Sequence, residues 1–516
     1  MKPVGLQNEF IAGMKRDFPR NRMPERSAWT IKDVILDYGA PARERGGWAH
    51  ASAAATASTG SYMSAGIYAV FSPTGGASPK NLAVLLHPSV AWRLVSVASD
   101  GTVTSIGDVY RALQNPVFHG GVAASAASAV YTGLVIFPDG DGASAPKKYD
   151  GTTLSALNGS PPAARYAAVY RDYTVLANGT VGGTYFPNRV WFSPPGDPDC
   201  FGTSGVSAWD TTDSWVDFST PVRGLAATKN ALFVFGDGQI ARLRGSTPPP
   251  DTDFENNDPW MQVGLLDAKS ITVAEDIVYW CAPEGVFRSD GVYLDNVTAK
   301  GGMLRHWLDL TATATTATTF ATGVIRGKLV ISVMNGATFT DAFLVDLETY
   351  AWTQLTNLDA VSFWNGTQAI GDETFFARRE DVYVGRCDSM FAEVDDASFK
   401  NDGDGTAVAA LIETAFFDLG RPGVKNLKGL HFGYALLDHA SDNPTVAVSY
   451  ITTPEATSYT SLGTLSETTA YDRKRLQMGG RYWGIGLKLA RSGAGDFQLS
   501  DITAEVSYQE ESKRMT

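Results

Sequence analysis

The chain has 516 residues, with 52 glycines, 25 prolines and a charged fraction of 19%. This composition is typical of a turn-rich β-protein and excludes a mainly helical or disordered chain. The length allows two or three domains, although a propeller can use most of such a chain as one unit. No long apolar window occurs, and the start, MKPVGLQNEF, lacks the pattern of a secretory signal, so we predict no membrane anchor.

The formal net charge of −13 is unevenly distributed along the sequence. Residues 51–400 hold 22 Lys and Arg against 35 Asp and Glu, so the whole excess lies in this middle part. A protein that grips nucleic acid carries the opposite sign, because cations displace the counterions of phosphates. An acidic surface suits a conduit through which DNA slides without binding. The alternative is that the acidity only keeps the protein soluble.

Residues 1–48 contain many turn-forming residues and arginines, and only Trp29–Leu36 is predicted to be a strand. We interpret this segment as an extended basic docking arm for an acidic neighbour in an assembly, since a mobile tail would leave its large apolar side chains in water. The residues expected to dock are Arg16, Arg20, Arg22 and Trp29.

Residues 49–400 show apolar runs of five to seven residues separated by Gly, Asn or Asp turns, which favours a divergent β-propeller without a WD or kelch signature. Five to eight blades are compatible with this pattern. Two alanine-rich runs, 51–58 and 120–130, suit inner strands better than helices because Ser, Thr and Gly accompany them. The candidate blades are Tyr68–Val109, Tyr131–Leu157, Tyr166–Phe192, Val222–Leu243, Ile271–Leu294, Phe320–Leu355 and Ala360–Val394.

The clearest stretch of this pattern is 189–245. RVWFSPPGDPDCFG ends a strand in a proline-rich turn, and RGLAATKNALFVFGDGQIARLRG predicts three short strands in a meander. Together with YWCAPEGVFRSDGVYLDN at 279–296, the arginine-rich start and GGRYW at 479–483, this stretch resembles tail proteins of tailed bacteriophages of the nozzle, hub or knob class. The resemblance implies a β-propeller-like fold and assembly as a ring, by expectation a hexamer, at the tail axis.

Two segments interrupt the blades. STPPPDTDFENNDP at 246–259 is predicted to be an exposed acidic loop that reaches the lumen or a neighbouring subunit, through Asp251, Asp253, Glu255 and Asp258. TATATTATT at 311–319 fits a solvated strand or a mobile loop, and the sequence does not choose between them.

Residues 401–516 are predicted to form a C-terminal β-sandwich, because several well-spaced apolar runs follow the boundary NDGDG. Their bounds are Val408–Phe417, Leu427–Leu437, Thr445–Ile451, Tyr482–Ala490 and Ile502–Tyr508. Carboxylates at alternate positions of the boundary, Asp402 and Asp404, resemble part of a calcium loop. A later acidic ligand is missing, which favours a plain linker.

The sequence contains no motif that predicts catalysis: no nucleophile elbow, Walker loop, HExxH or sialidase Asp-box is present. The three cysteines, Cys200, Cys281 and Cys387, and the six histidines lack metal-ligand spacing, so no metal, cofactor or disulfide is expected. The aromatic residues Trp191, Phe192, Trp209, Trp215 and Trp364 are interpreted as blade core and loop anchors rather than a sugar groove.

These observations predict a non-enzymatic structural protein of the virion tail, made in the host cytoplasm. Its expected partners are further copies in a homo-oligomeric ring, other tail or portal-adaptor proteins and tail fibres, with genomic DNA passing through without sequence-specific binding. The alternative is a peripheral receptor-binding or glycan-cleaving propeller of the tail.

Overall fold

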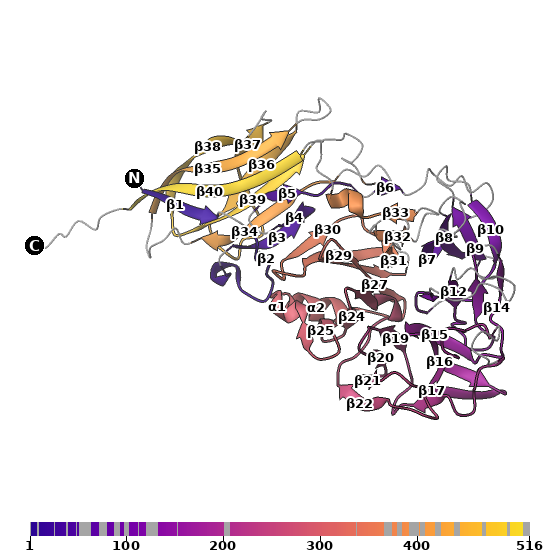
Figure 1. Cartoon of the computed structure of the whole chain (residues 1–516). Coiled ribbons are helices and arrows are strands. Elements are labelled where there is room, and N and C mark those ends of the chain that lie inside the picture. The colour runs from indigo at the N-terminus through magenta and orange to yellow at the C-terminus, as the bar shows by residue number, and fades with distance from the viewer. Residues whose placement is uncertain are drawn as a thin grey trace, which may run out of the picture.

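A computed structural model describes residues 2–7, 10–24, 26–37, 40–47, 49–50, 63–71, 80–86, 93–97, 103–111, 113–119, 133–151, 153–200, 207–336, 338–365, 374–378, 384–391, 402, 408–417, 425–437, 444–466, 471–492 and 496–508. Within these residues the chain is all-β, with a β-propeller on one side and a β-sandwich on the other (Figure 1). Both alanine-rich runs lie outside the described residues.

The propeller consists of seven antiparallel four-stranded blades in the described part of the chain, of which six are separate sheets and one continues into a sheet of the sandwich. The first three are β7 (Met63–Phe71), β8 (Lys80–Leu86), β9 (Arg93–Val97) and β10 (Val103–Asp108); β11 (Val117–His119), β12 (Leu134–Phe137), β13 (Lys147–Tyr149) and β14 (Leu154–Ala156); and β15 (Ala163–Tyr170), β16 (Tyr173–Val181), β17 (Thr184–Phe192) and β18 (Trp215–Asp217). Each of the seven predicted blades falls on one of these sheets.

The next three sheets continue in sequence order. They are β19 (Gly224–Ala227), β20 (Leu232–Phe235), β21 (Ile240–Arg244) and β22 (Glu255–Met261); β23 (Thr272–Ala274), β24 (Ile277–Ala282), β25 (Gly285–Ser289) and β26 (Leu294–Asn296); and β27 (Thr318–Ile325), β28 (Lys328–Asn335), β29 (Thr338–Asp346) and β30 (Trp352–Leu355). Two short helices, α1 (Val297–Lys300) and α2 (Leu304–Ala312), precede β27. The threonine-rich stretch 311–319 therefore runs from the end of α2 through a turn into β27.

The last blade closes the propeller with a strand from the start of the chain. Strands β31 (Ala360–Asn365), β32 (Thr374–Arg378) and β33 (Val384–Arg386) are completed by β6 (Ala49–His50), which pairs with β33. The first strand of each blade packs against the first strand of a neighbouring blade, as in β15 with β19 and β27 with β31, and β31 contacts β7. The first strands therefore surround the axis, and the fourth strands form the rim.

The sandwich is built from both ends of the chain. One sheet has the order β38 (Asp472–Tyr482), β35 (Lys425–Leu437), β40 (Asp496–Tyr508), β5 (Ala42–Glu44) and β4 (Val34–Ile35), with β1 (Lys2–Gln7) also on β40. The other has β3 (Ser27–Lys32), β34 (Leu411–Phe417), β39 (Ile485–Ser492), β36 (Thr445–Ile451) and β37 (Thr460–Ser466). Strand β2 (Gly13–Met14) pairs with β3, and short 3-10 helices lie at Arg20–Arg22, Ala268–Ser270 and Asp388–Phe391.

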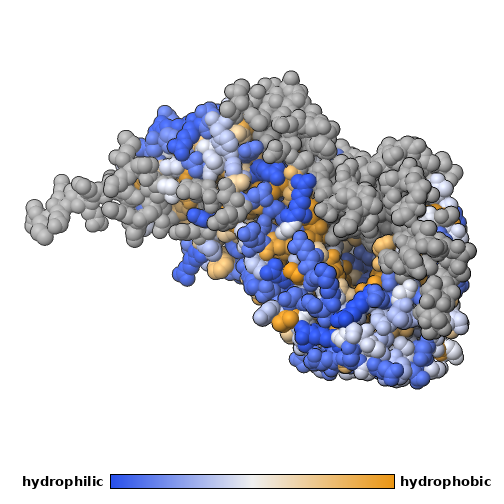
Figure 2. Space-filling view, in the orientation of Figure 1, coloured by the Kyte–Doolittle hydropathy of each residue, from blue (hydrophilic) through white to orange (hydrophobic). Residues whose placement is uncertain are grey.

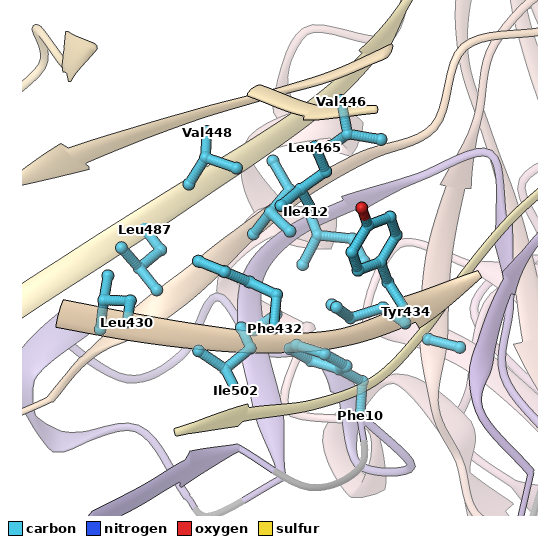
Figure 3. Close-up of a cluster of buried hydrophobic side chains, with 14 of the residues drawn as sticks. Phe10, Ile412, Leu430, Phe432, Tyr434, Val446, Val448, Leu465, Leu487 and Ile502 are labelled. Atoms are coloured by element: carbon cyan, nitrogen blue, oxygen red, sulfur yellow. The ribbon is translucent and has the colours of Figure 1, made fainter. Parts of the chain in front are cut away.

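The core of the sandwich shows why residues 1–48 are not the separate arm that was predicted. Phe10 packs beside Phe432, Tyr434 and Ile502, which come from the C-terminal strands (Figure 3). The segment is extended, as expected, but β1, β3, β4 and β5 are paired within the two sheets. Its apolar side chains are thus buried against its own chain. The predicted domain boundary near residue 400 lies outside the described residues.

Strand β3 also joins the sandwich to the propeller, because it pairs in parallel with β30 of the sixth blade. In β2, which pairs with β3, Gly13 has a φ of +67°, and a Cβ there would lie 2.5 Å from the backbone nitrogen of Trp352. Only glycine permits this close approach without strain. The N-terminal segment is therefore packed directly against the sixth blade.

Buried ion pairs complete the junction between the two parts. Arg45 donates to Asp33 at 2.7 Å and to both carboxylate oxygens of Asp402 at 2.7 and 3.0 Å, with all three side chains at most 1% exposed. It also donates to the carbonyl of Thr356, which follows β30. Burial alone would lower the pKa of Arg45, but Asp33 and Asp402 raise it. The guanidinium thus links three distant segments as a permanent cation.

Candidate assembly site

Three of the predicted docking residues meet on the face of the sandwich sheet that points away from its core. Thr30 lies opposite Glu413 in the pairing of β3 with β34, and Glu413 lies opposite Lys488 in the pairing of β34 with β39. Side chains opposite one another on neighbouring strands share a face of the sheet. Since the adjacent Ile412 and Leu487 are in the core, Thr30, Glu413 and Lys488 form a polar row on the other face.

Glu413 is the centre of this row. Thr30 Oγ1 donates to Glu413 Oε2 at 2.7 Å, and Lys488 Nζ lies 3.6 Å from Oε1. Arg16 Nη2 in turn donates to Thr30 Oγ1 at 3.0 Å. The segment before β3 is therefore held on the sheet by a chain of hydrogen bonds that ends at one carboxylate.

Aromatic rings hold the arginines of the same segment. The Cζ atom of Arg16 lies 4.6 Å from the centre of the Trp29 ring, and that of Arg20 lies 5.8 Å from Trp29 and 5.5 Å from Tyr459. Arg20 also hydrogen-bonds to the Tyr459 hydroxyl and to the carbonyl of Thr414. Cation–π contacts of this kind contribute about 0.5–2 kcal/mol, more when water is excluded. We name Arg16, Arg20, Trp29, Glu413, Tyr459 and Lys488 the cation cluster.

The cation cluster contains three cationic side chains and one carboxylate. Burial lowers the pKa of Arg16, Glu413 opposes this, and the neighbouring Arg20 lowers it further. The Nε atom of Arg16 is buried and has no hydrogen-bond partner within the described residues. Positive charge is therefore in excess at this place on the sandwich.

The sequence identified part of this cluster only. Arg16, Arg20 and Trp29 come together as predicted, but the surface on which they dock is the chain's own sandwich. Arg22, the fourth predicted residue, is exposed at the end of its 3-10 helix. Glu413, Tyr459 and Lys488 carry no local sequence signal and were missed.

The predicted acidic loop precedes and enters β22, the rim strand of the fourth blade. Two of its four carboxylates, those of Asp253 and Asp258, accept hydrogen bonds from other residues of the chain. Asp253 accepts hydrogen bonds from the backbone of Thr247 and from both the hydroxyl and backbone of Ser246, which lower its pKa to about 2. Asp258 accepts from Ser219 at 2.6 and 2.8 Å and from Gln239 at 3.0 Å.

The other two carboxylates of the loop point into solvent. Asp251 is exposed, and so is Glu255, which accepts a long 3.5 Å hydrogen bond from Asn257. Because β22 is the strand farthest from the axis in its blade, this loop lies at the rim of the propeller, away from the propeller's own axis. Contact of the loop with the lumen of a ring or with a neighbouring subunit stays a prediction.

The boundary segment near residue 402 and the three cysteines were considered from the sequence for metal or disulfide roles. Asp402 of the boundary segment pairs with Arg45, and its neighbours 401 and 403–407 lie outside the described residues. Among the described residues, no group of three or more His, Cys, Asp or Glu is placed to hold a metal ion. Cys281 and Cys387 are buried, and burial raises the pKa of the half-buried Cys200 to about 12.

The aromatic residues considered for a sugar groove are mostly internal. Trp191, Phe192 and Trp209 are buried, whereas Trp215 is half-buried with the guanidinium of Arg189 lying 3.4 Å from its ring centre. The side chain of Trp364 lies outside the described residues. In the part of the chain that the structure describes, no helix has the length and apolar character needed to span a membrane.

No protein-family model matches the chain, and no curated protein matches it. Among solved structures, the extracellular domain of the hybrid two component system BT4673 from B. thetaiotaomicron matches with a TM-score of 0.40 and 9% identity, over 88% of this chain and 60% of that one. The exo-beta-1,3-galactanase from Phanerochaete chrysosporium gives 0.22 and 10%, over 90% and 100%. The WD40 β-propeller domain of Doa1 gives 0.25 and 8%, over 66% and 96%. The blade count and the sandwich follow from the sheet topology.

Proposed function

We propose that the chain is a ring-forming structural subunit of a tailed-phage tail, at the nozzle or hub. In this role six copies enclose part of the DNA conduit and retain the genome until ejection. The subunit acts through assembly and charge, without catalysis. Its neighbours are further copies, portal-adaptor or other tail proteins, and tail fibres.

The observation that supports this proposal best is that the fold implied by the sequence resemblance is the fold of this chain. The stretch at 189–245, which resembles phage tail proteins, runs through β17 and β18 of the third blade and β19 to β21 of the fourth. The two blades share one apolar core, which includes Val190, Phe192, Leu225 and Phe235. The residues that carry the resemblance are thus the residues that build the propeller.

Two further features suit a ring around passing DNA. The excess of acidic residues lies between 51 and 400, the part of the chain that forms the propeller, and negative charge repels the phosphate backbone. The junction at Arg45 fixes the sandwich to the propeller with directional hydrogen bonds. A ring closes only when each subunit presents its contact surfaces at a fixed angle, and a rigid subunit meets this requirement.

The location of the protein in the particle tests the proposal. Gold-labelled antibodies raised against the purified chain are applied to intact phage particles and to isolated tails, with pre-immune serum as the control. The proposal predicts label on the tail axis at its free end. Label on fibres away from the axis, together with binding to host-surface glycans by the purified protein, would favour the peripheral receptor-binding or glycan-cleaving alternative.

A further inference from the structure

We infer that the cation cluster binds the acidic rim loop of a second copy of this chain, so that Asp251 and Glu255 of one subunit meet Arg16 and Lys488 of the next. This inference rests on the proposed ring and names the contact that holds its subunits together. The occupant is thus a carboxylate-bearing loop at the edge of another propeller.

The first step is the charge imbalance of the cluster. Glu413 contacts Thr30 and Lys488, and the charges of Glu413 and Asp341 both act on Arg16, so two carboxylates stand against the three cations Arg16, Arg20 and Lys488. Thr30 connects Arg16 to Glu413, and the Tyr459 hydroxyl accepts from Arg20, so both neutral groups are used in positioning the cations. Partly buried cations require an anion nearby, because their desolvation is otherwise uncompensated.

The second step is access. The side chain of Lys488 is 34% exposed, and its Nζ lies 5.2 Å from the centre of the Tyr459 ring. Arg16 and Trp29 are also only half-buried. A carboxylate of a docking chain can therefore reach Lys488 without unfolding the N-terminal segment, and it would enter an environment where charge-assisted hydrogen bonds are strong.

The third step identifies the occupant. Asp251 and Glu255 are exposed, whereas Asp253 fixes the shape of the loop and Asp258 ties its end to Ser219. The loop thus offers two carboxylates on a preorganised backbone. Ordering a loop on binding costs free energy, and a loop held by its own hydrogen bonds has already met part of that cost.

The two charged surfaces lie at separate places on the molecule. Figure 1 places β22 at an end of the propeller remote from the sandwich, where β3 and β34 lie, and Figure 2 shows hydrophilic residues over both regions. Two complementary surfaces at separate places on one chain cannot satisfy each other within that chain. Between copies they make a head-to-tail contact, which generates a ring when the rotation closes.

The test uses the full-length chain with reversed charges. The variant Asp251→Lys/Glu255→Lys alters only exposed loop residues, and Lys488→Glu alters the other side of the contact. Asp309→Lys/Glu348→Lys gives the same change in net charge at exposed positions elsewhere on the surface. Sedimentation velocity over a range of concentrations, at low and at high salt, gives the concentration at which half of the chains are assembled.

The inference predicts that either reversal raises this concentration at least tenfold at low salt, while the control variant changes it less than twofold. Combining both reversals in one chain restores assembly, because the charges are again complementary. If the wild-type ring persists unchanged in both reversals, the inference is wrong and the ring stands. If the wild-type chain stays monomeric at every concentration, the proposed ring fails and the inference with it.

Discussion

The interior of the propeller and its junction with the sandwich are stabilised in different ways. The blades pack through apolar and aromatic side chains, such as Phe235 with Trp280 of the next blade at 5.5 Å and Trp280 with Phe287 of its own blade at 5.7 Å between ring centres. These residues lie close together in the sequence. The junction instead uses buried charges that are far apart in the sequence, as in Arg45 with Asp402.

Apolar packing and buried ion pairs contribute differently to the stability and to the geometry of the molecule. Apolar packing is nondirectional, so the blades can vary in sequence as long as their volume is kept. Buried ion pairs add little net stability but are costly to break, and they satisfy one geometry only. The junction therefore fixes the angle between propeller and sandwich, while the apolar core of the propeller contributes free energy of folding through burial.

The largest effect is expected at the junction. Replacing Arg45 by Met leaves Asp33 and Asp402 buried without their cation, which should lower the free energy of unfolding by about 5 kcal/mol. Chemical denaturation followed by tryptophan fluorescence measures this loss. The triple variant Arg45→Met/Asp33→Asn/Asp402→Asn removes the charges together and should recover most of the loss. A single variant as stable as the wild type would show that the junction does not depend on these pairs.

A slightly smaller loss is expected in the propeller. Trp280→Ala removes a fully buried ring between Phe235 and Phe287 and should cost about 4 kcal/mol through the lost burial and the cavity. Trp280→Phe keeps most of the packing and should cost less than half as much. Unlike the loss in the Arg45 variant, the free energy of unfolding lost in Trp280→Ala should be the same at low and high salt. A salt-dependent loss would contradict the view that apolar packing stabilises the propeller.

The pH dependence of stability tests a second buried pair, which lies between strands of the sandwich. Glu44 accepts from Arg491 at 2.6 Å, but burial outweighs this contact and raises the pKa of Glu44 from 4.5 to about 8. The folded state then binds a proton more tightly than the unfolded state. The contribution of protonated Glu44 to the free energy of unfolding is fully present below pH 4.5 and is lost as the pH rises toward 8. Glu44→Gln should flatten this part of the profile, and an unchanged slope would assign it to other groups.

The smallest effect is expected on the propeller surface. Lys229 lies 2.9 Å from Asp276, but its side chain is 84% exposed. Exposed ion pairs contribute little, so Lys229→Ala should change the melting temperature by about 1 °C or less, within the range of pairs worth a few tenths of a kcal/mol. A change comparable to that of the Arg45 variant would remove the contrast between buried and exposed pairs.

The blades could be predicted from the sequence because each is a local meander, in which apolar runs alternate with short turns. The meander at 222–244 became β19, β20 and β21 almost at its predicted bounds. Pairing between distant segments has no such signal. No local pattern indicates that β6 closes the last blade or that β3 lies between β30 and β34. Strand β38 was missed because its residues are mostly polar, with only Leu476 and Met478 buried.

The candidate site was predicted to a similar extent. An arginine-rich segment with Trp29 indicates docking, but composition cannot tell an intramolecular surface from a partner. The acidic loop was recognised from Pro and Asp residues, yet its position at the rim depends on β22 being the fourth strand of its blade. In both cases the sequence did not show where the segment lies in the fold, which local patterns do not encode.

The ring is the central claim, and electron microscopy of the purified chain tests it most directly. Negative-stain images are combined with mass photometry at several concentrations. The account predicts closed rings with a central hole and a mass near six times 55.2 kDa. A monomer or a compact trimer without a hole, at every concentration, would contradict it.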